Sequence, residues 1–91
     1  MNKTAFRKEV KKKVSGLKHG EKVELSGNIV VFCNDFKAVH YGQTYHTTQY
    51  QAKRPSAHTI SVFYLDSFGS TEELIGQMSD TLYEYRQEEK C

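Results

Sequence analysis

The pattern of apolar positions predicts a helix at each end of the chain. The first, over about residues 4–17, has apolar side chains at the spacing that places them on one helical face: Phe6, Val10, Val14 and Leu17. The second, over about residues 71–88, follows the capping-box sequence Ser70-Thr71-Glu72-Glu73. Its apolar stripe consists of Leu74, Met78, Leu82 and Tyr85, with Ile75 beside it.

Between the helices, the alternation of apolar and polar residues predicts three strands. The first covers about residues 22–33 and directs Val23, Leu25, Ile29, Val31 and Cys33 to one face. Asn34-Asp35 fits a two-residue hairpin turn. The second strand follows over about residues 36–51, with a bulge expected at Gly42. The sequence after Lys53 is typical of a loop, and the third strand covers about residues 58–65.

The resulting α-β-β-β-α order predicts a single α+β domain over residues 1–91. Consecutive antiparallel strands need only hairpins, so we expect a three-stranded antiparallel meander. Both helices would pack on one face of it, which gives a two-layer sandwich with an open second face. A chain of 91 residues is long enough for one such domain and too short for two.

Composition narrows the cellular compartment in which the protein is expected. No apolar run approaches 18 residues, and no apolar segment follows the basic N-terminal residues, so neither a membrane span nor a secretory signal is expected. Cys33 and Cys91 are the two cysteines, and they form no Cys-x-x-Cys pair. These observations predict a cytoplasmic protein with Cys33 buried as a small hydrophobic residue.

Charge is distributed unevenly along the chain. Residues 1–22 carry eight Lys/Arg against two Glu, whereas residues 55–91 carry seven Asp/Glu against two Lys/Arg. The basic segment is either a solvated helix face or a surface for phosphates. For the second case, the candidate nucleic-acid-binding residues lie on the first helix and in the loop after the second strand: Arg7, Lys8, Lys11, Lys12, Lys53 and Arg54.

Motifs for catalysis or metal binding are missing. The four histidines, at positions 19, 40, 46 and 58, form no H-x-x-H or H-E-x-x-H pattern, and the sequence has no G-x-S-x-G and no phosphate-binding loop. We therefore expect no metal, no cofactor and no enzymatic activity.

Aromatic residues gather in the second half of the predicted sheet. Tyr combines contact area with a hydroxyl group and is enriched at interfaces. Some of these rings are expected to complete the core and others to form a recognition face. The candidate partner-binding residues come from this region and from the acidic second helix: His40, Tyr41, Tyr45, His46, Tyr50, Glu84 and Glu88.

The order of elements resembles that of the double-stranded-RNA-binding domain. In that family, a Lys-rich N-terminus of the second helix binds phosphates, whereas Ser70-Thr71-Glu72-Glu73 is acidic here. The size and layout are also similar to those of small phage-encoded inhibitors of bacterial defence nucleases, including inhibitors of CRISPR nucleases. This second resemblance implies a cytoplasmic, non-catalytic protein that acts by binding.

The leading hypothesis is therefore a non-catalytic binding module for a protein or a protein–nucleic acid complex, such as an anti-CRISPR-like inhibitor from a phage or mobile element. The alternative is a nucleic-acid-binding domain that uses the basic first helix and the Lys53-Arg54 loop. A homodimer formed by sheet extension stays open, because residues 44–51 of the second strand are rich in Thr and Tyr and are expected to be exposed, either at an edge or on one face.

Overall fold

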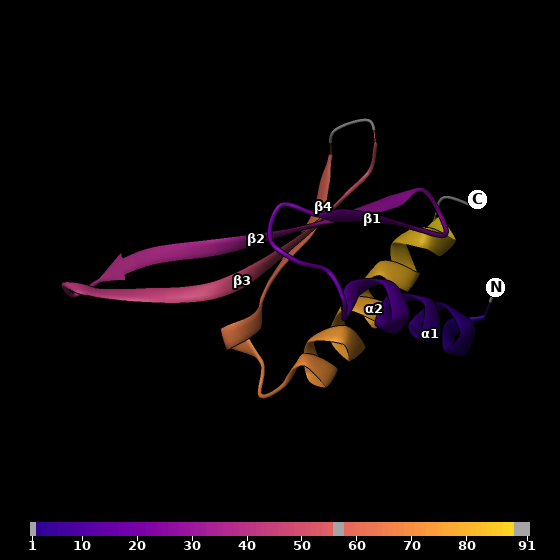
Figure 1. Ribbon diagram of the computed structural model, residues 1–91. Helices are drawn as coiled ribbons and strands as arrows, with labels where there is room; N and C mark the ends of the chain where they lie inside the picture. Colours follow the sequence, from indigo (N-terminus) through magenta and orange to yellow (C-terminus); the bar gives the residue numbers. More distant parts are fainter. Residues whose placement is uncertain (1, 56–57, 89–91) are drawn as a thin grey trace.

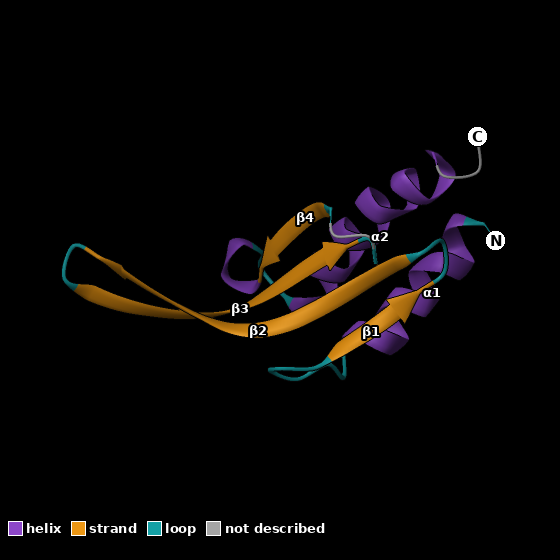
Figure 2. Cartoon of the chain, turned by 90° about the horizontal axis from the view of Figure 1, so that it is seen from above, coloured by secondary structure: helices purple, strands orange, loops and turns teal. Residues whose placement is uncertain are grey.

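The computed structural model of the chain describes residues 2–55 and 58–88. Its elements are α1 (Lys3–Val14), β1 (Lys22–Leu25), β2 (Ile29–His40), β3 (Gln43–Lys53), β4 (Thr59–Tyr64), the short 3-10 helix η1 (Leu65–Ser67) and α2 (Thr71–Glu88). The strands form one antiparallel sheet in the order β1-β2-β3-β4, and both helices lie on one of its faces (Figures 1 and 2). The predicted α+β class is confirmed.

The sheet has four strands rather than the predicted three, because the chain reverses at other residues. The segment predicted as the first strand contains a tight turn at Ser26-Gly27-Asn28, which separates β1 from β2. Gly27 and Asn28 have φ angles of 89° and 65°, in the left-handed region that glycine and asparagine tolerate. The α-β-β-β-β-α order that results departs from that of the double-stranded-RNA-binding domain.

The second reversal occurs at Tyr41-Gly42, where a bulge was predicted. His40 pairs with Gln43, so Tyr41 and Gly42 alone form the turn, with φ angles of 52° and 75°. The hairpin turn predicted at Asn34-Asp35 is wrong. Both residues are extended within β2 and pair with β3.

The core lies between the helices and the covered face of the sheet. On the sheet side it contains the predicted residues Leu25, Ile29, Val31 and Cys33, joined by Tyr50, Ala52 and Phe63. On the helix side it contains Phe6, Val10 and Val14 of α1 with Leu74, Ile75, Met78 and Leu82 of α2. The predicted apolar spacing is therefore confirmed for these seven residues. Leu17 lies beyond the end of α1 and is only partly buried, and Tyr85 is half-buried outside this core.

Local capping fixes the helix starts. The Asn2 side chain accepts a hydrogen bond of 2.8 Å from the Ala5 N–H at the beginning of α1. At α2, the Ser70 hydroxyl accepts from the Glu73 N–H at 3.2 Å, while the Glu73 carboxylate accepts from the Gly69 N–H at 2.9 Å. This reciprocal pair is close to the predicted capping box. α1 ends at Val14, earlier than predicted, and its C-cap is Ser15, whose N–H donates to the Lys11 carbonyl at 3.2 Å.

The two helices lie side by side and run in opposite directions. Lys3 forms an ion pair of 3.2 Å with Asp80, and the Arg7 guanidinium lies against Gly76, one turn earlier in α2. The basic and acidic ends of the chain are thus neighbours. No helix in the part of the chain that the structure describes is long and apolar enough to cross a membrane.

Candidate functional site: the β2–β3 arm

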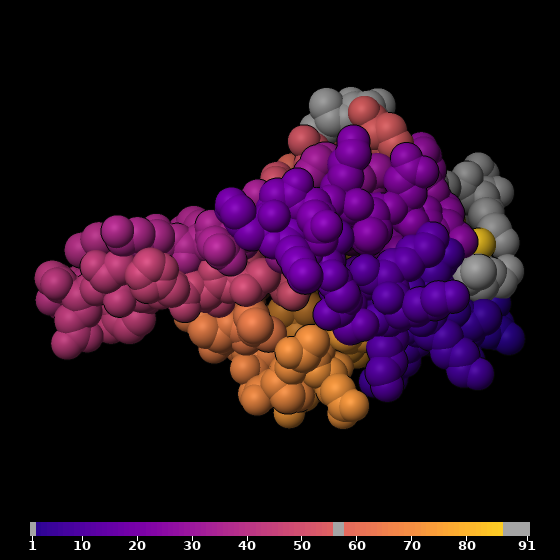
Figure 3. Space-filling view, viewed as in Figure 1, coloured from indigo at the N-terminus to yellow at the C-terminus, as the bar shows by residue number. Residues whose placement is uncertain are grey.

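The far half of the β2–β3 hairpin projects beyond the rest of the molecule (Figures 1 and 3). We call residues 36–47 the arm. Its strands pair in a continuous register from Phe36 opposite Thr47 to His40 opposite Gln43. Pairing of β4 with β3 stops at Gln49, so the arm is a two-stranded ribbon that no other strand extends. It contributes to the long axis of the molecule, whose extents are 47 × 27 × 20 Å.

Exposed apolar side chains are concentrated on this arm. Among the described residues, four large hydrophobic side chains are exposed, and all four belong to it: Phe36 (36%), Val39 (69%), Tyr41 (93%) and Tyr45 (45%). Phe36 and Tyr45 share the helix-free side of the ribbon, whereas Val39 lies on its other side and Tyr41 in the turn. Scattered surface apolar residues are ordinary, but their concentration on one projecting element is typical of an interaction surface.

The tip of the arm is held by ring contacts. His40 and Tyr41 meet edge to face, with ring centroids 4.3 Å apart, and Tyr45 lies 6.4 Å from the same imidazole. The Tyr45 hydroxyl donates to the side-chain oxygen of Gln43 at 3.2 Å. Tyr41 occupies the left-handed region, which is unfavourable for an aromatic residue. A strained, almost fully exposed ring at the end of a projecting ribbon is suited to contact another molecule.

At its base the arm is anchored to the helix-free face of the sheet. The rings of Phe36 and Tyr64 meet edge to face at 5.2 Å, and the Gln49 side-chain amide donates to the Tyr64 hydroxyl at 3.3 Å. The Asp66 N–H donates to the Thr47 hydroxyl at 3.0 Å. A shallow hollow of about 220 Å³ lies here, lined mainly by arm residues with Tyr64, Asp66 and Ser67. These contacts give the arm a fixed point of departure.

Of the predicted partner-binding residues, the arm contains His40, Tyr41, Tyr45 and His46. The pairing alternation directs His40 and Tyr45 to the helix-free side and His46, opposite Lys37, to the other. Tyr50 is not on this surface: it is 6% exposed and lies opposite Cys33 in the core, where burial, and then the nearby Cys33, raise the pKa of its phenol.

The predicted acidic residues are not brought to the arm. Glu84 is exposed near the C-terminal end of α2, which lies on the opposite side of the molecule from the arm tip (Figure 1). Glu88 is the last residue of α2, and its side chain lies outside the described part of the structure. Phe36 and Val39 were missed as site residues. Once the strand register is known, their exposure can be inferred, because the β3 residues opposite them are Thr47 and Thr44 and not apolar residues.

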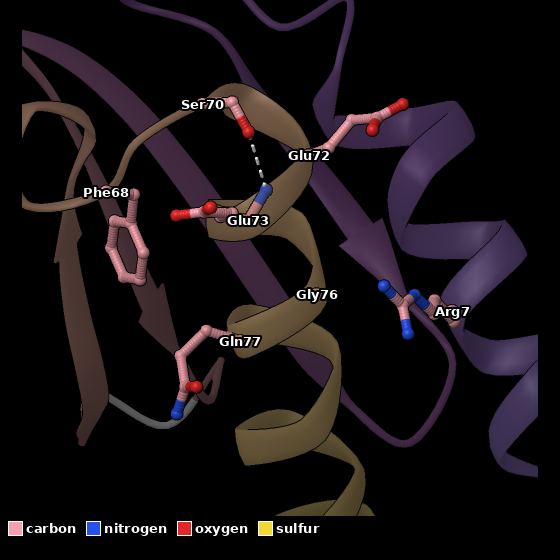
Figure 4. Close-up of a pocket in the computed structure, with 7 residues that line it drawn as sticks. All are labelled: Arg7, Phe68, Ser70, Glu72, Glu73, Gly76 and Gln77. Carbon is pink, nitrogen blue, oxygen red and sulfur yellow. Dashed lines mark hydrogen bonds between the residues drawn. The ribbon is translucent and has the colours of Figure 1, made fainter.

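The predicted nucleic-acid-binding residues do not share one surface. Arg7 points toward α2 and lines a shallow hollow that also holds Glu72 and Glu73 (Figure 4). Lys8, Lys11 and Lys12 are exposed on α1. Lys53 belongs to the opposite, helix-free side of the sheet, where its ammonium group lies 5.4 Å from the centre of the Phe32 ring. Arg54 lines the same groove as Lys53.

Phe32 is the centre of a small basic cluster on the helix-free face. The ammonium group of Lys22 also lies over its ring, 5.8 Å from the centroid. Cations near a ring face are attracted by its negative potential. The surrounding groove also includes Glu24, Val30 and Pro55. It lies at the end of the sheet away from the arm tip, because Phe32 pairs with Gln51 and not with an arm residue.

No group of three or more His, Cys, Asp or Glu side chains in the part of the chain that the structure describes is placed to hold a metal ion. Cys33 is buried, and its burial, followed by the charges of Asp35 and Glu21, raises the pKa of its thiol. A raised pKa disfavours the thiolate, which is the nucleophilic form.

Comparison of the chain with protein-family models, with curated proteins and with solved structures found no match.

Proposed function

We propose that the chain is a non-catalytic binding module that engages a protein, or a protein–nucleic acid complex, through the β2–β3 arm. The observation that carries this proposal is the location of all four exposed large hydrophobic side chains of the described residues on the arm. Aromatic side chains at the centre of an interface supply much of its binding free energy, because they bury a large area with few rotatable bonds. Tyr41 and Tyr45 are suited to this role.

The first test is partner capture from a lysate of the source organism. The test variant combines Val39→Thr, Tyr41→Ser and Tyr45→Ser, which removes apolar area from the arm while leaving its backbone ladder in place. The matched control combines Lys8→Ser and Lys12→Ser on α1. We expect the arm variant to lose the captured partner at least tenfold and the control to retain it. Equal capture by the arm variant and wild type would remove the arm from the interface.

One form of such a module is an inhibitor of a host defence nuclease, carried by a phage or mobile element. This form of the proposal is supported by the small size of the chain and its sheet-plus-helix layout, which are similar to those of known small nuclease inhibitors. The corresponding test is cleavage of a target DNA by the candidate nuclease with wild type or the arm variant added. Inhibition that the arm variant lacks supports this form of the proposal, and uninhibited cleavage with wild type rejects it for that nuclease.

A second candidate function is binding of single-stranded nucleic acid on the helix-free face. The observation in its favour is the placement of Lys22 and Lys53 over Phe32, because basic groups beside a stackable ring suit a phosphate chain with unstacked bases. Affinity for a labelled oligonucleotide would then fall steeply with salt, by roughly one log unit per log unit of salt for each phosphate contact. Lys22→Glu with Lys53→Glu would abolish it. No binding at low salt excludes this candidate.

A further inference from the structure

The outer edge of β2 is paired along the body of the sheet and open along the arm. On the body, the Cys33 N–H donates to the Glu21 carbonyl at 3.0 Å, and the Cys33 carbonyl accepts from the Gly20 N–H at 2.8 Å. The Asp35 N–H donates to Nδ1 of His19 at 2.8 Å. Beyond Asp35, no described segment pairs with this side of β2.

Alternation along an antiparallel strand identifies the open groups. The N–H and C=O groups of successive residues point to opposite edges, so residues two apart point the same way. Cys33 and Asp35 direct theirs away from β3, and Lys37 and Val39 must therefore do the same. The arm thus presents a short free edge over residues 36–40, with two donors and two acceptors. Such an edge is a template for another strand.

The opposite edge of the arm is less suited to pairing. By the same alternation, β3 directs the backbone groups of Thr44, His46 and Thr48 outward. Near its base this edge is occupied by η1, where the Asp66 N–H is bonded to the Thr47 side chain.

We propose that the free edge of β2 pairs with the same edge of a second copy of this chain, antiparallel and with the two-fold axis at Ala38. This inference rests on the proposed function of the arm as the recognition element and names its partner. Lys37 then faces Val39 of the second copy in both directions, so all the open groups form four backbone hydrogen bonds. Phe36 faces His40 of the second copy, and the small Ala38 side chains meet at the axis.

Neighbouring registers are excluded by features of the strand itself. An axis at Lys37 places two ammonium groups opposite each other and requires the Asp35 N–H, which His19 already occupies. An axis at Val39 requires Tyr41 to be extended, whereas its φ of 52° places it in the turn. Only the axis at Ala38 uses the whole free edge and no residue outside it. The two hairpins would join into a four-stranded intermolecular sheet, a form of β-augmentation.

Disulfide trapping tests the register. With the axis at Ala38, the two Ala38 residues form a non-hydrogen-bonded pair with Cα atoms about 4.5 Å apart, a distance that a disulfide spans. Ala38→Cys in a Cys91→Ser background should give a covalent dimer in a glutathione redox buffer. Thr44→Cys in the same background is the matched control, because it is an exposed arm residue on β3, which the two β2 strands would separate from β3 of the second copy. We expect at least tenfold faster dimer formation for Ala38→Cys, and equal rates would overturn the register.

Proline substitution tests the edge without a cross-link. The Val39 N–H points outward, so Val39→Pro removes an intermolecular donor and leaves the β2–β3 ladder intact. Thr44→Pro does the same on the β3 edge. Light scattering after size exclusion, over a range of protein concentrations, should show a concentration-dependent dimer for wild type and Thr44→Pro and a monomer for Val39→Pro.

The outcomes separate this inference from the proposed function. A monomeric wild type without an Ala38→Cys dimer overturns the self-pairing, and so does a Val39→Pro variant that dimerises as wild type does. If self-pairing fails and the arm variant still loses a captured protein, the proposed function stands with another partner. If the arm variant retains every partner as well, both fail. Should Val39→Pro not fold, the disulfide experiment decides alone.

Discussion

The ring of Phe36 on β2 meets the ring of Tyr64 on β4 edge to face, with 5.2 Å between the centroids, at the point where the arm leaves the body of the sheet. A two-stranded ribbon is marginally stable by itself in water, so its order depends on such an anchor. Phe36 is also the residue at which the arm begins, where β2 has β3 on one side and no strand on the other. The contact therefore connects the stability of the body to the order of the proposed recognition element.

Loss of this anchor should loosen the arm selectively. An aromatic pair of this geometry contributes about 1 kcal/mol, so we expect Tyr64→Ala to speed amide exchange over residues 36–47 by roughly fivefold. Tyr64→Phe, which keeps the ring contact and loses only the hydrogen bond from Gln49, should exchange nearly as wild type does. Hydrogen–deuterium exchange with mass spectrometry measures both. Unchanged exchange of the arm in Tyr64→Ala would show that the anchor does not order it.

Replacement of Tyr41 by Asn should separate order from recognition. Asn tolerates the left-handed region better than Tyr, and Asn-Gly is a favoured two-residue hairpin turn. We expect Tyr41→Asn to slow amide exchange of the arm by roughly fivefold, equivalent to about 1 kcal/mol, and at the same time to weaken partner capture. Tyr45→Asn is the matched control for amide exchange, because it makes the same change on the arm at a residue outside the turn. Faster exchange in Tyr41→Asn would contradict the strain assigned to Tyr41.

Gly27 should be the more demanding of the two turn glycines. A Cβ atom there would overlap with Cγ of Arg86, and the φ of 89° is unfavourable for alanine as well. Overpacking and left-handed strain together predict that Gly27→Ala lowers the free energy of unfolding by about 2–3 kcal/mol. Gly42 has a φ of 75° but open space around an added Cβ atom, so a loss of about 1 kcal/mol is expected for Gly42→Ala. Urea denaturation compares the two, and equal losses would show that the Arg86 contact is relieved at no cost.

Glu9 should make stability depend on acid pH. Its carboxylate accepts hydrogen bonds from the Ser26 N–H at 3.0 Å and the Ser26 hydroxyl at 2.8 Å. Burial opposes its ionisation, but these bonds and the charge of Lys13 outweigh burial and lower the pKa of Glu9 below 4.5. A carboxylate with a lowered pKa in the folded state stabilises the protein above its unfolded-state pKa, and this contribution is lost as the pH falls through the folded-state pKa.

We therefore expect Glu9→Gln to lower the free energy of unfolding at pH 7 by about 1–2 kcal/mol and to reduce the loss of stability below a pH of about 4.5. Urea denaturation at neutral and acid pH measures both effects. Glu84→Gln, at an exposed position of α2, is the control and should follow wild type. A Glu9→Gln variant that loses as much stability in acid as wild type would contradict this role.

Sequence patterns predicted the helices and the core more closely than the sheet. The buried faces of α1 and α2 follow directly from apolar spacing, and Leu25, Ile29, Val31 and Cys33 were placed correctly because strand alternation survives the turn between β1 and β2. The turns themselves were misplaced. Asn34 and Asp35 lie where β2 leaves the body of the sheet, which the helices cover, and enters the exposed arm. Their polarity fits this exposure and not a reversal of the chain.

The arm could be predicted only in part. His40, Tyr41, Tyr45 and His46 were selected for their chemistry, and the change from core to surface after Val39 was expected. The change occurs earlier, since Phe36 and Val39 are already exposed. Tyr50 was selected on the same grounds and lies in the core. What separates it from Tyr45 is the extent of the helices over the sheet, which depends on tertiary packing and not on the local sequence.

Site-specific photocrosslinking in cells of the source organism tests the central claim most directly. A photoreactive benzoylphenylalanine replaces Tyr41 at the arm tip in one protein, and Glu84 on α2 in a matched control. We predict a discrete cross-linked product from position 41, whose mass identifies a second copy or another protein, and none from position 84. A product from position 84 with none from position 41 would contradict the assignment of the arm as the recognition element.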